Sequence, residues 1–149
     1  LPGCPWLVLY ICFLELNLWE VDVDAIAFDV DEDVEIGNNS KIWHWTHISS
    51  CASIGENCIL GPRITINAND HIFKKGKLIK DQGLIHKDVI VEDDCWFGAN
   101  TVINKGVKIK SGSVVGACSL VNKDTEKDSI NVGIPSKKIG YREEWNNFY

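Results

Sequence analysis

The chain has 149 residues, 45% of them hydrophobic and 24% charged, which suits one globular domain and excludes a disordered or collagen-like chain. Its formal net charge is −6, but residues 1–40 carry nine carboxylates and no Lys or Arg, so the remainder sums to +3. A duplex-binding module needs a dominant basic face, so we expect no nucleic-acid partner. The positive groups gather in two short regions, residues 74–80 and 105–138, which suits a small anionic ligand.

Residues 1–29 are expected to form an N-terminal capping segment, with Trp6–Trp19 covering one end of the fold. The longest apolar stretch, Trp6–Leu14, has nine residues, whereas a membrane-spanning helix needs roughly 20. It also lacks the basic flank and cleavage site of a signal peptide. The six cysteines show no CxxC spacing and fit reduced thiols. We therefore expect a cytoplasmic protein without a membrane span. The chain begins with Leu rather than Met, which fits a fragment or a trimmed chain.

Aliphatic and aromatic residues, here called anchors, recur every six positions in two runs. The anchors are Val30, Ile36, Ile42, Ile48, Ile54, Leu60 and Ile66, then Val91, Phe97, Ile103, Ile109, Val115 and Val121. Four residues after each anchor comes a mostly small or β-branched residue: Val34, Ser40, Thr46, Ala52, Cys58, Ile64, then Cys95, Thr101, Val107, Ser113, Ser119 and Thr125. A period of six fits neither an α-helix nor one continuous strand. It predicts an all-β fold, a parallel β-helix over residues 30–140, with about 18 residues in each of four to five three-sided coils.

Glycines at the predicted corners are expected to supply the positive φ of tight turns. They are Gly37, Gly55, Gly61, Gly98, Gly106, Gly112 and Gly116. Residues 67–88 are polar and lysine-rich, lack the six-residue pattern, and are predicted to form a loop inserted into the coil. Long loops on rigid scaffolds are commonly functional. Residues 141–149 are expected to form a C-terminal tail that packs on the coil or on a neighbouring subunit.

The segments Ile36-Gly37-Asn38-Asn39 and Ile54-Gly55-Glu56-Asn57 resemble the hexapeptide repeats of left-handed β-helix acyltransferases. Residues 91–100, 115–124 and 133–137 are similar to the C-terminal block of galactoside, maltose and xenobiotic O-acetyltransferases and of polysaccharide O-acetyltransferases. The resemblance covers residues 30–140. It implies a left-handed coil, acetyl-CoA as cosubstrate, and a homotrimer with active sites between subunits.

The resemblance also implies site residues. The catalytic His of the family matches His71, near the start of the inserted loop. Chemistry gives an independent reason for a His there, because a neutral imidazole can take the proton of an attacking sugar hydroxyl. Asn69 and Asp70 precede it and are assigned to acceptor binding. Asp70 is a candidate to orient His71, although neighbouring residues in an extended chain point to opposite sides.

His44 falls near a family residue that holds the acceptor hydroxyl, and Trp43 or Trp45 has a ring suited to stacking on a sugar. Aromatic packing at a subunit interface is the structural alternative for these three residues. His86 lies at the return of the loop and is given no role. A zinc site of the kind found in β-helical carbonic anhydrases needs three ligands. The spacing of His44 and His47 does not match that family, so no metal is expected.

Coenzyme contacts are carried over in the same way. Backbone groups at Ala99 and Ala117 match positions that bind pantetheine, and Trp96 matches a Trp found in many O-acetyltransferases, although a ring filling a coil corner is the alternative. Asn122 and Lys123 match a Thr-Lys pair near the adenosine. Lys137 matches a basic residue that meets a CoA phosphate. A second basic residue expected at Gly140 is absent, and Lys138 or Arg142 is the candidate substitute.

The favoured interpretation is an acetyl-CoA-dependent O-acetyltransferase that acts on a sugar or a polysaccharide precursor, with His71 as general base. One alternative is a nucleotide-sugar N-acetyltransferase, because residues 42–48 and 51–58 look similar to those enzymes. The other is a non-catalytic β-helix that binds glycans.

Overall fold

The structure is a computed structural model, and it describes residues 22–23, 29–31 and 33–147. The predicted N-terminal cover, Trp6–Trp19, lies outside the described residues, as do Cys4, Cys12 and Phe148.

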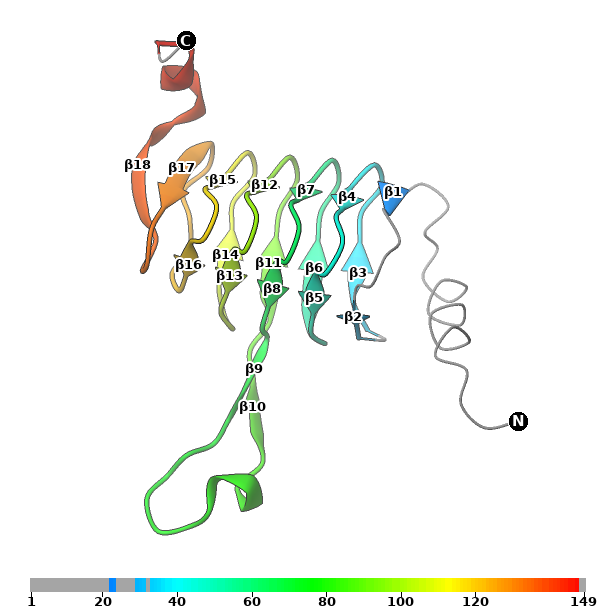
Figure 1. Cartoon of the computed structure of the whole chain (residues 1–149), viewed down its shortest axis with the longest axis vertical. Coiled ribbons are helices and arrows are strands. Elements are labelled where there is room, and N and C mark those ends of the chain that lie inside the picture. Colours follow the sequence, from blue (N-terminus) through cyan, green and yellow to red (C-terminus); the bar gives the residue numbers. More distant parts are fainter. Residues whose placement is uncertain (1–21, 24–28, 32, 148–149) are drawn as a thin grey trace, which may run out of the picture.

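Short parallel strands form the three faces of a prism (Figure 1). Face A comprises β1 (Asp22–Val23), β4 (Lys41–Ile42), β7 (Ile59–Leu60), β12 (Trp96–Phe97), β15 (Val114–Val115), β17 (Ser129–Val132) and β18 (Lys137–Tyr141). Face B comprises β2 (Asp29–Val30), β5 (His47–Ile48), β8 (Thr65–Ile66), β13 (Val102–Ile103) and β16 (Leu120–Val121). Face C comprises β3 (Glu35–Ile36), β6 (Ala52–Ile54), β11 (Val89–Val91) and β14 (Lys108–Ile109). The chain visits A, B and C in turn, as a β-helix requires.

The register of these strands explains the two runs of anchors. Within a run, each anchor pairs with the anchor 18 residues later, as Ile42 does with Leu60 and Phe97 with Val115. Across the insertion the pairs are 37 residues apart, for example Leu60 with Phe97. The coil therefore resumes in register after 19 additional residues. The predicted fold class, a left-handed parallel β-helix of hexapeptide repeats, is confirmed.

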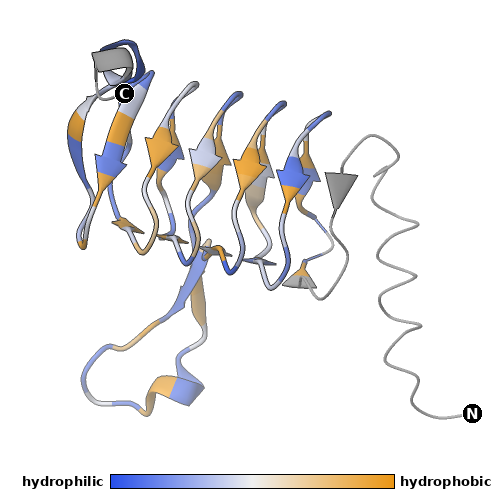
Figure 2. Cartoon of the chain, turned by 45° about the horizontal axis from the view of Figure 1, so that its top comes forward, coloured by the Kyte–Doolittle hydropathy of each residue, from blue (hydrophilic) through white to orange (hydrophobic). Residues whose placement is uncertain are grey.

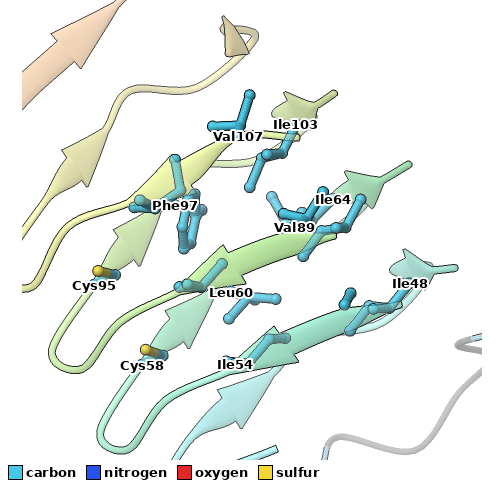
Figure 3. Close-up of a cluster of buried hydrophobic side chains, with 14 of the residues drawn as sticks. Ile48, Ile54, Cys58, Leu60, Ile64, Val89, Cys95, Phe97, Ile103 and Val107 are labelled. Carbon is cyan, nitrogen blue, oxygen red and sulfur yellow. The ribbon is translucent and has the colours of Figure 1, made fainter. Parts of the chain in front are cut away.

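The interior of the prism is filled as the pattern predicts. Every anchor is buried except Ile36, which is half-buried, and all twelve residues four positions after an anchor are buried. Figure 3 shows Leu60 and Phe97 side by side in adjacent coils, with Cys58 and Cys95 stacked near them. Buried hydroxyls are satisfied along the coil; Ser40 Oγ, for instance, donates to the carbonyl of Gly55 at 2.8 Å and accepts from the N–H of Cys58 at 2.9 Å.

The expected role of the corner glycines is largely wrong. Among the seven named, only Gly106 and Gly112 have positive φ. The others follow an anchor and lie against the next coil: a Cβ on Gly98 would be 2.5 Å from the backbone N of Ala117. These positions exclude a side chain because the coils approach closely, not because φ is positive. The left-handed conformation lies two residues further on, mostly in non-glycine residues such as Asn57 (φ 58°) and Asn100 (φ 59°).

The corners are named here after the faces that they join. The A/B corner contains residues 43–46, 61–64, 98–101 and 116–119. The B/C corner contains 31, 33–34, 49–51, 67–88, 104–107 and 122–125. The C/A corner contains 37–40, 55–58, 92–95 and 110–113.

One corner is interrupted by a protruding hairpin, which Figure 1 shows extending from the B/C corner. It consists of β9 (Asn69–His71) paired in antiparallel fashion with β10 (Leu84–His86), and its tip carries the 3₁₀ helix η2 (Ile79–Asp81). The N–H of Lys87 donates to the carbonyl of Ala68 at 2.8 Å, which closes the base. Figure 2 shows apolar and polar residues mixed along the hairpin. Its residues 70–88 are exposed apart from half-buried Ile72 and Gln82, so this segment adds nothing to the core.

The C-terminal end of face A departs from the parallel pattern. β18 runs antiparallel to β17 and is followed by the 3₁₀ helix η3 (Arg142–Asn147). At the other end β1 pairs in parallel with β4, so face A begins within the predicted capping segment. Over the described ranges, no helix is long and apolar enough to cross a membrane.

Candidate functional site

His71 ends β9, and the hairpin register decides which residues share its face. His71 lies opposite Leu84, and Asn69 lies opposite His86. Side chains alternate along a strand, so Asn69, His71, Leu84 and His86 share one face while Asp70 and Ile85 share the other. His71 is exposed, which leaves its imidazole accessible to a substrate.

Asp70 does not orient His71. Its Oδ2 forms an ion pair with Nζ of Lys105, which belongs to the next coil at the B/C corner. The opposite directions of neighbouring side chains in β9 explain this partner. The ion pair ties the root of the hairpin to the coil, so it fixes the strand from which His71 projects.

The A/B corner holds the three aromatic acceptor candidates. Trp43, His44 and Trp45 connect β4 to β5, with Trp43 46% exposed, Trp45 56% exposed and His44 half-buried. The N–H of Arg63, in the next coil, donates to the carbonyl of His44 at 3.0 Å. This hydrogen bond joins the 43–46 turn to the 61–64 turn of the next coil.

Ala99 and Ala117 lie further along the same A/B corner, in adjacent coils. At three equivalent positions of the other corners, a carboxylate accepts the backbone N–H: Asp31 from Ser50 at 2.6 Å, Asp93 from Glu56 at 2.8 Å and Glu92 from Ser111 at 2.9 Å. No acceptor among the described residues takes the N–H of Ala99 or Ala117.

Two stacked donors beside small side chains fit a thread-like ligand that carries amide carbonyls, as the pantetheine arm of acetyl-CoA does. The A/B turns 43–46, 61–64, 98–101 and 116–119 contain no carboxylate that would compete for these two donors. Acetyl-CoA would supply an acetyl group activated as a thioester.

Trp96 lies on the outside of face A, 52% exposed, beside a cavity of about 470 Å³. The cavity lies between face A and the C-terminal segment. Its lining includes Ile59, Trp96, Val114, Ile139 and Trp145. Sequence reasoning missed this cavity, although the aromatic tail after β18 was its signal. Arg142 also lines it, but its guanidinium bonds Asp94 Oδ2 at 2.6 Å, so Arg142 is an ion-pair partner within the chain.

The candidate phosphate-binding lysines differ in whether another residue of the chain already binds their side chain. Lys138 bonds Glu126 Oε2 at 2.6 Å and the hydroxyl of Tyr141 at 2.7 Å, and these contacts raise the pKa of Lys138. Lys137 is exposed, and no partner in the described part of the chain engages it. Asn122 and Lys123 are exposed at the B/C corner, two coils from the root of the hairpin. Lys123 and Lys137 are therefore better placed than Lys138 to meet an anion.

The described cysteines form no disulfide. Cys51, Cys58, Cys95 and Cys118 are free thiols, and a hydrogen bond with Cys58 together with burial raises the pKa of Cys95. Within the described ranges, no group of three or more His, Cys, Asp or Glu side chains is arranged to hold a metal ion.

The predicted site residues thus fall into groups on different parts of one prism. The A/B corner brings Trp43, His44 and Trp45 into line with Ala99 and Ala117, whereas His71 lies on the hairpin from the B/C corner. Within a single chain, the candidate base and the alanine donors do not share a corner.

Comparisons with known proteins bear on this arrangement. Residues 33–68 and 88–123, on either side of the hairpin, match the family described as bacterial transferase hexapeptide (six repeats). The galactoside O-acetyltransferase of Escherichia coli K12 is 31% identical over 116 residues, which is 76% of this chain and 57% of that protein. The Lactococcus lactis galactoside O-acetyltransferase is 34% identical over 82 residues, 55% of this chain and 39% of that protein.

Among solved structures, a hexapeptide-repeat-containing acetyltransferase from Vibrio cholerae in complex with acetyl coenzyme A matches with a TM-score of 0.72 and 25% identity. The match covers 87% of this chain and 74% of that one. The prism, its hexapeptide register and its interrupting hairpin define a left-handed β-helix of the transferase type. The chain belongs to the hexapeptide-repeat acetyltransferase family. It spans about half the length of the curated relatives that it matches.

Proposed function

We propose that the chain is an acetyl-CoA-dependent O-acetyltransferase that acts on a hydroxyl of a sugar or a polysaccharide precursor. One observation carries the proposal: the long insertion in the hexapeptide coil presents His71 on an exposed face of a hairpin that contributes nothing to the core. Long loops on rigid scaffolds commonly carry binding and catalytic residues, which supports a functional role for this hairpin. The galactoside O-acetyltransferases named above support a sugar acceptor.

In this proposal, His71 is the general base. A neutral imidazole nitrogen of His71 accepts the proton of the acceptor hydroxyl as the oxygen attacks the acetyl carbonyl, and the imidazolium can return that proton to the leaving thiolate. The N–H groups of Ala99 and Ala117 hold the pantetheine arm, with Trp96 beside it. Lys137, with Asn122 and Lys123, faces the nucleotide end. Asn69 and the Trp43–Trp45 turn position the acceptor, and Asp70 fixes the root of the hairpin through Lys105.

We further propose that the active unit is a homotrimer. The hairpin and the alanine donors belong to different corners of one prism, so a complete site needs the hairpin of one copy beside the A/B corner of another. Packing three prisms around a common axis gives each site this pairing. The proposal places the enzyme in the cytoplasm, where acetyl-CoA is available and free thiols such as Cys118 persist.

A coupled thiol assay tests the activity. The protein is mixed with acetyl-CoA and a panel of neutral sugars and amino sugars, and release of CoA is followed with a thiol-reactive dye. We expect turnover with at least one sugar, and a product that mild base hydrolyses, because an ester is labile where an amide survives.

His71→Ala and His86→Ala make a matched pair, since both imidazoles are exposed on one face of the hairpin. His71→Ala should lower kcat by about 10²–10⁴-fold with little change in acetyl-CoA affinity. His86→Ala should stay within a few-fold of the unmodified protein. Equal activity in the two variants would remove His71 from the mechanism, and a base-stable product would favour N-acetylation.

A further inference from the structure

The residues in left-handed conformation differ between corners. Along the C/A corner they are Asn39, Asn57, Asp94 and Gly112, the residue types that tolerate positive φ. Along the A/B corner they are Trp45 (φ 65°), Arg63 (φ 59°), Asn100 (φ 59°) and Cys118 (φ 57°). The coil geometry is the same, so the difference lies in which side chains the A/B corner carries.

Trp and Arg are poor choices for this backbone. A bulky side chain at positive φ crowds its own carbonyl, which costs free energy that Asn or Gly would largely avoid. Residues held in such strained conformations cluster at functional sites. Trp45 and Arg63 occupy equivalent positions of adjacent coils, about 4.8 Å apart in the stacking direction, so both side chains leave the corner in the same direction.

Both side chains are largely exposed. Trp45 is 56% exposed and Arg63 is exposed. No hydrogen bond or ion pair from any described residue engages the guanidinium of Arg63. The cation–π contact found among the described residues joins Lys138 to Tyr141 and does not involve Arg63 or Trp45. Arg142 makes a clear contrast, because its guanidinium is paired with Asp94, itself a left-handed residue of the C/A corner.

The surroundings of Arg63 favour an anion. Carboxylates occupy the other corners, where Asp31, Asp93 and Glu92 accept backbone N–H groups. The A/B turns 43–46, 61–64, 98–101 and 116–119 contain none. The N–H of His44 also finds no acceptor in the described part of the chain. An uncompensated guanidinium, an available N–H and two exposed indoles therefore lie on adjacent turns.

We propose that Trp45 and Arg63 form an acceptor subsite for a sugar that carries a negative charge. The indole of Trp45 stacks on the apolar face of the sugar ring, and the guanidinium of Arg63 pairs with a carboxylate or phosphate on the same sugar. This subsite rests on the proposed function, because it selects the acceptor of that reaction. It is separate from the coenzyme contacts at Ala99 and Ala117, which lie on later turns of the same corner.

Direct binding without acetyl-CoA tests the subsite. Glucuronate, glucose 6-phosphate and neutral glucose are titrated into the full chain, and binding is followed by ligand-observed NMR at low and high salt. We expect the charged sugars to bind at least tenfold more tightly than glucose, with the preference shrinking as salt rises. The two charged probes distinguish a carboxylate from a phosphate as the preferred group.

Asparagine variants remove the side chains and relieve the backbone at once. Arg63→Asn should reduce binding of the charged sugars to the level of glucose, and Trp45→Asn should weaken binding of all three. Cys118→Asn, at an equivalent exposed position two coils away from Arg63, is the control and should bind like the unmodified chain. Each melting temperature should be unchanged or slightly raised, so misfolding would be detected.

Three results would overturn the subsite. The first is equal affinity of the unmodified chain for glucose and glucuronate, and the second is an Arg63→Asn variant that keeps the preference for charged sugars. The third is an Arg63→Asn variant whose oligomer mass changes in light scattering while its sugar binding does not. The last would mean that another copy covers Arg63. Binding is measured without the acetyl donor, so its failure is distinguishable from that of the reaction. Acetyl transfer that depends on His71 but not on Arg63 would retain the enzyme and reject the subsite.

Discussion

The coil and the hairpin follow different rules. In the coil, a residue's place in the six-residue repeat fixes its burial, and Phe97 is completely buried because it is an anchor. In the hairpin, Phe73 is 76% exposed, and composition says little about environment. The comparison indicates that the coil provides the stability of the fold, whereas the hairpin presents side chains to solvent. Four experiments test this division.

Excision of the hairpin should give the largest effect, and it should fall on activity. Deleting residues 69–87 joins Ala68 to Asp88, places Val91 six residues after Ile66 and puts Val89 at the small inward position, so the hexapeptide register is restored. We expect a folded β-helix by circular dichroism, because loop length contributes only weakly to stability. Acetyl transfer should fall by at least the factor of about 10²–10⁴ that a general base supplies. Retained turnover would place the chemistry on the coil.

Replacing one phenylalanine by alanine in the coil and one in the hairpin compares how much each region contributes to the free energy of unfolding. Phe97→Ala leaves a cavity between Leu60 and Val115, its neighbours along face A, and should lower the free energy of unfolding by about 3–5 kcal/mol. Phe73→Ala should change it by less than about 0.5 kcal/mol, since the ring is mostly in solvent. Urea denaturation of both variants gives the two numbers. Similar losses would mean that the hairpin packs on something in solution.

Alanine at a glycine tests whether close coil stacking sets the corners. A Cβ on Gly98 would lie 2.5 Å from the backbone N of Ala117, so Gly98→Ala should cost about 1–3 kcal/mol as adjacent coils are pushed apart. Gly76 in the hairpin has open space around it but a φ of 98°, so Gly76→Ala should cost about 1 kcal/mol or less. Thermal unfolding measures both. A milder effect at Gly98 than at Gly76 would contradict the stacking explanation.

The smallest effect should be a pH dependence at Glu92. Its carboxylate accepts hydrogen bonds from the N–H of Ser111 at 2.9 Å and lies 3.1 Å from Nζ of Lys108, and these contacts lower the pKa of Glu92 from 4.5 to about 2. A depressed pKa means that the contribution of Glu92 is present above about 4.5 and is lost as pH falls toward about 2.

The advantage of the unmodified chain over Glu92→Gln should therefore shrink between those pH values in urea denaturation. Asp70→Asn, at the hairpin's ion pair with Lys105, serves as the control and should shift stability little at any pH, because that pair is partly exposed. A constant difference for Glu92→Gln would assign its effect to packing rather than to charge.

The coil could be predicted from the sequence because its anchors repeat the same six-residue spacing many times. The inward residues that sequence reasoning listed are buried apart from half-buried Ile36, but it did not list Ala68 and Val89, which are buried beside the insertion. It misjudged the corner glycines, since a close approach between Gly98 and Ala117 involves residues in different coils. It also gave no role to Arg63, because the left-handed backbone conformation of that residue is known only from the structure.

The six-residue period by itself determined a prism-shaped β-helix and its repeating buried positions, because repetition converts local spacing into global geometry. The family was indicated by the resemblance of residues 91–100, 115–124 and 133–137 to O-acetyltransferases, not by the period. Tertiary structure decided which turns lie on a common corner, that Asp70 meets Lys105 rather than His71, and that no described residue accepts from the N–H of Ala99 or Ala117. These features depend on contacts between coils 18 or 37 residues apart, whose partners no local pattern specifies.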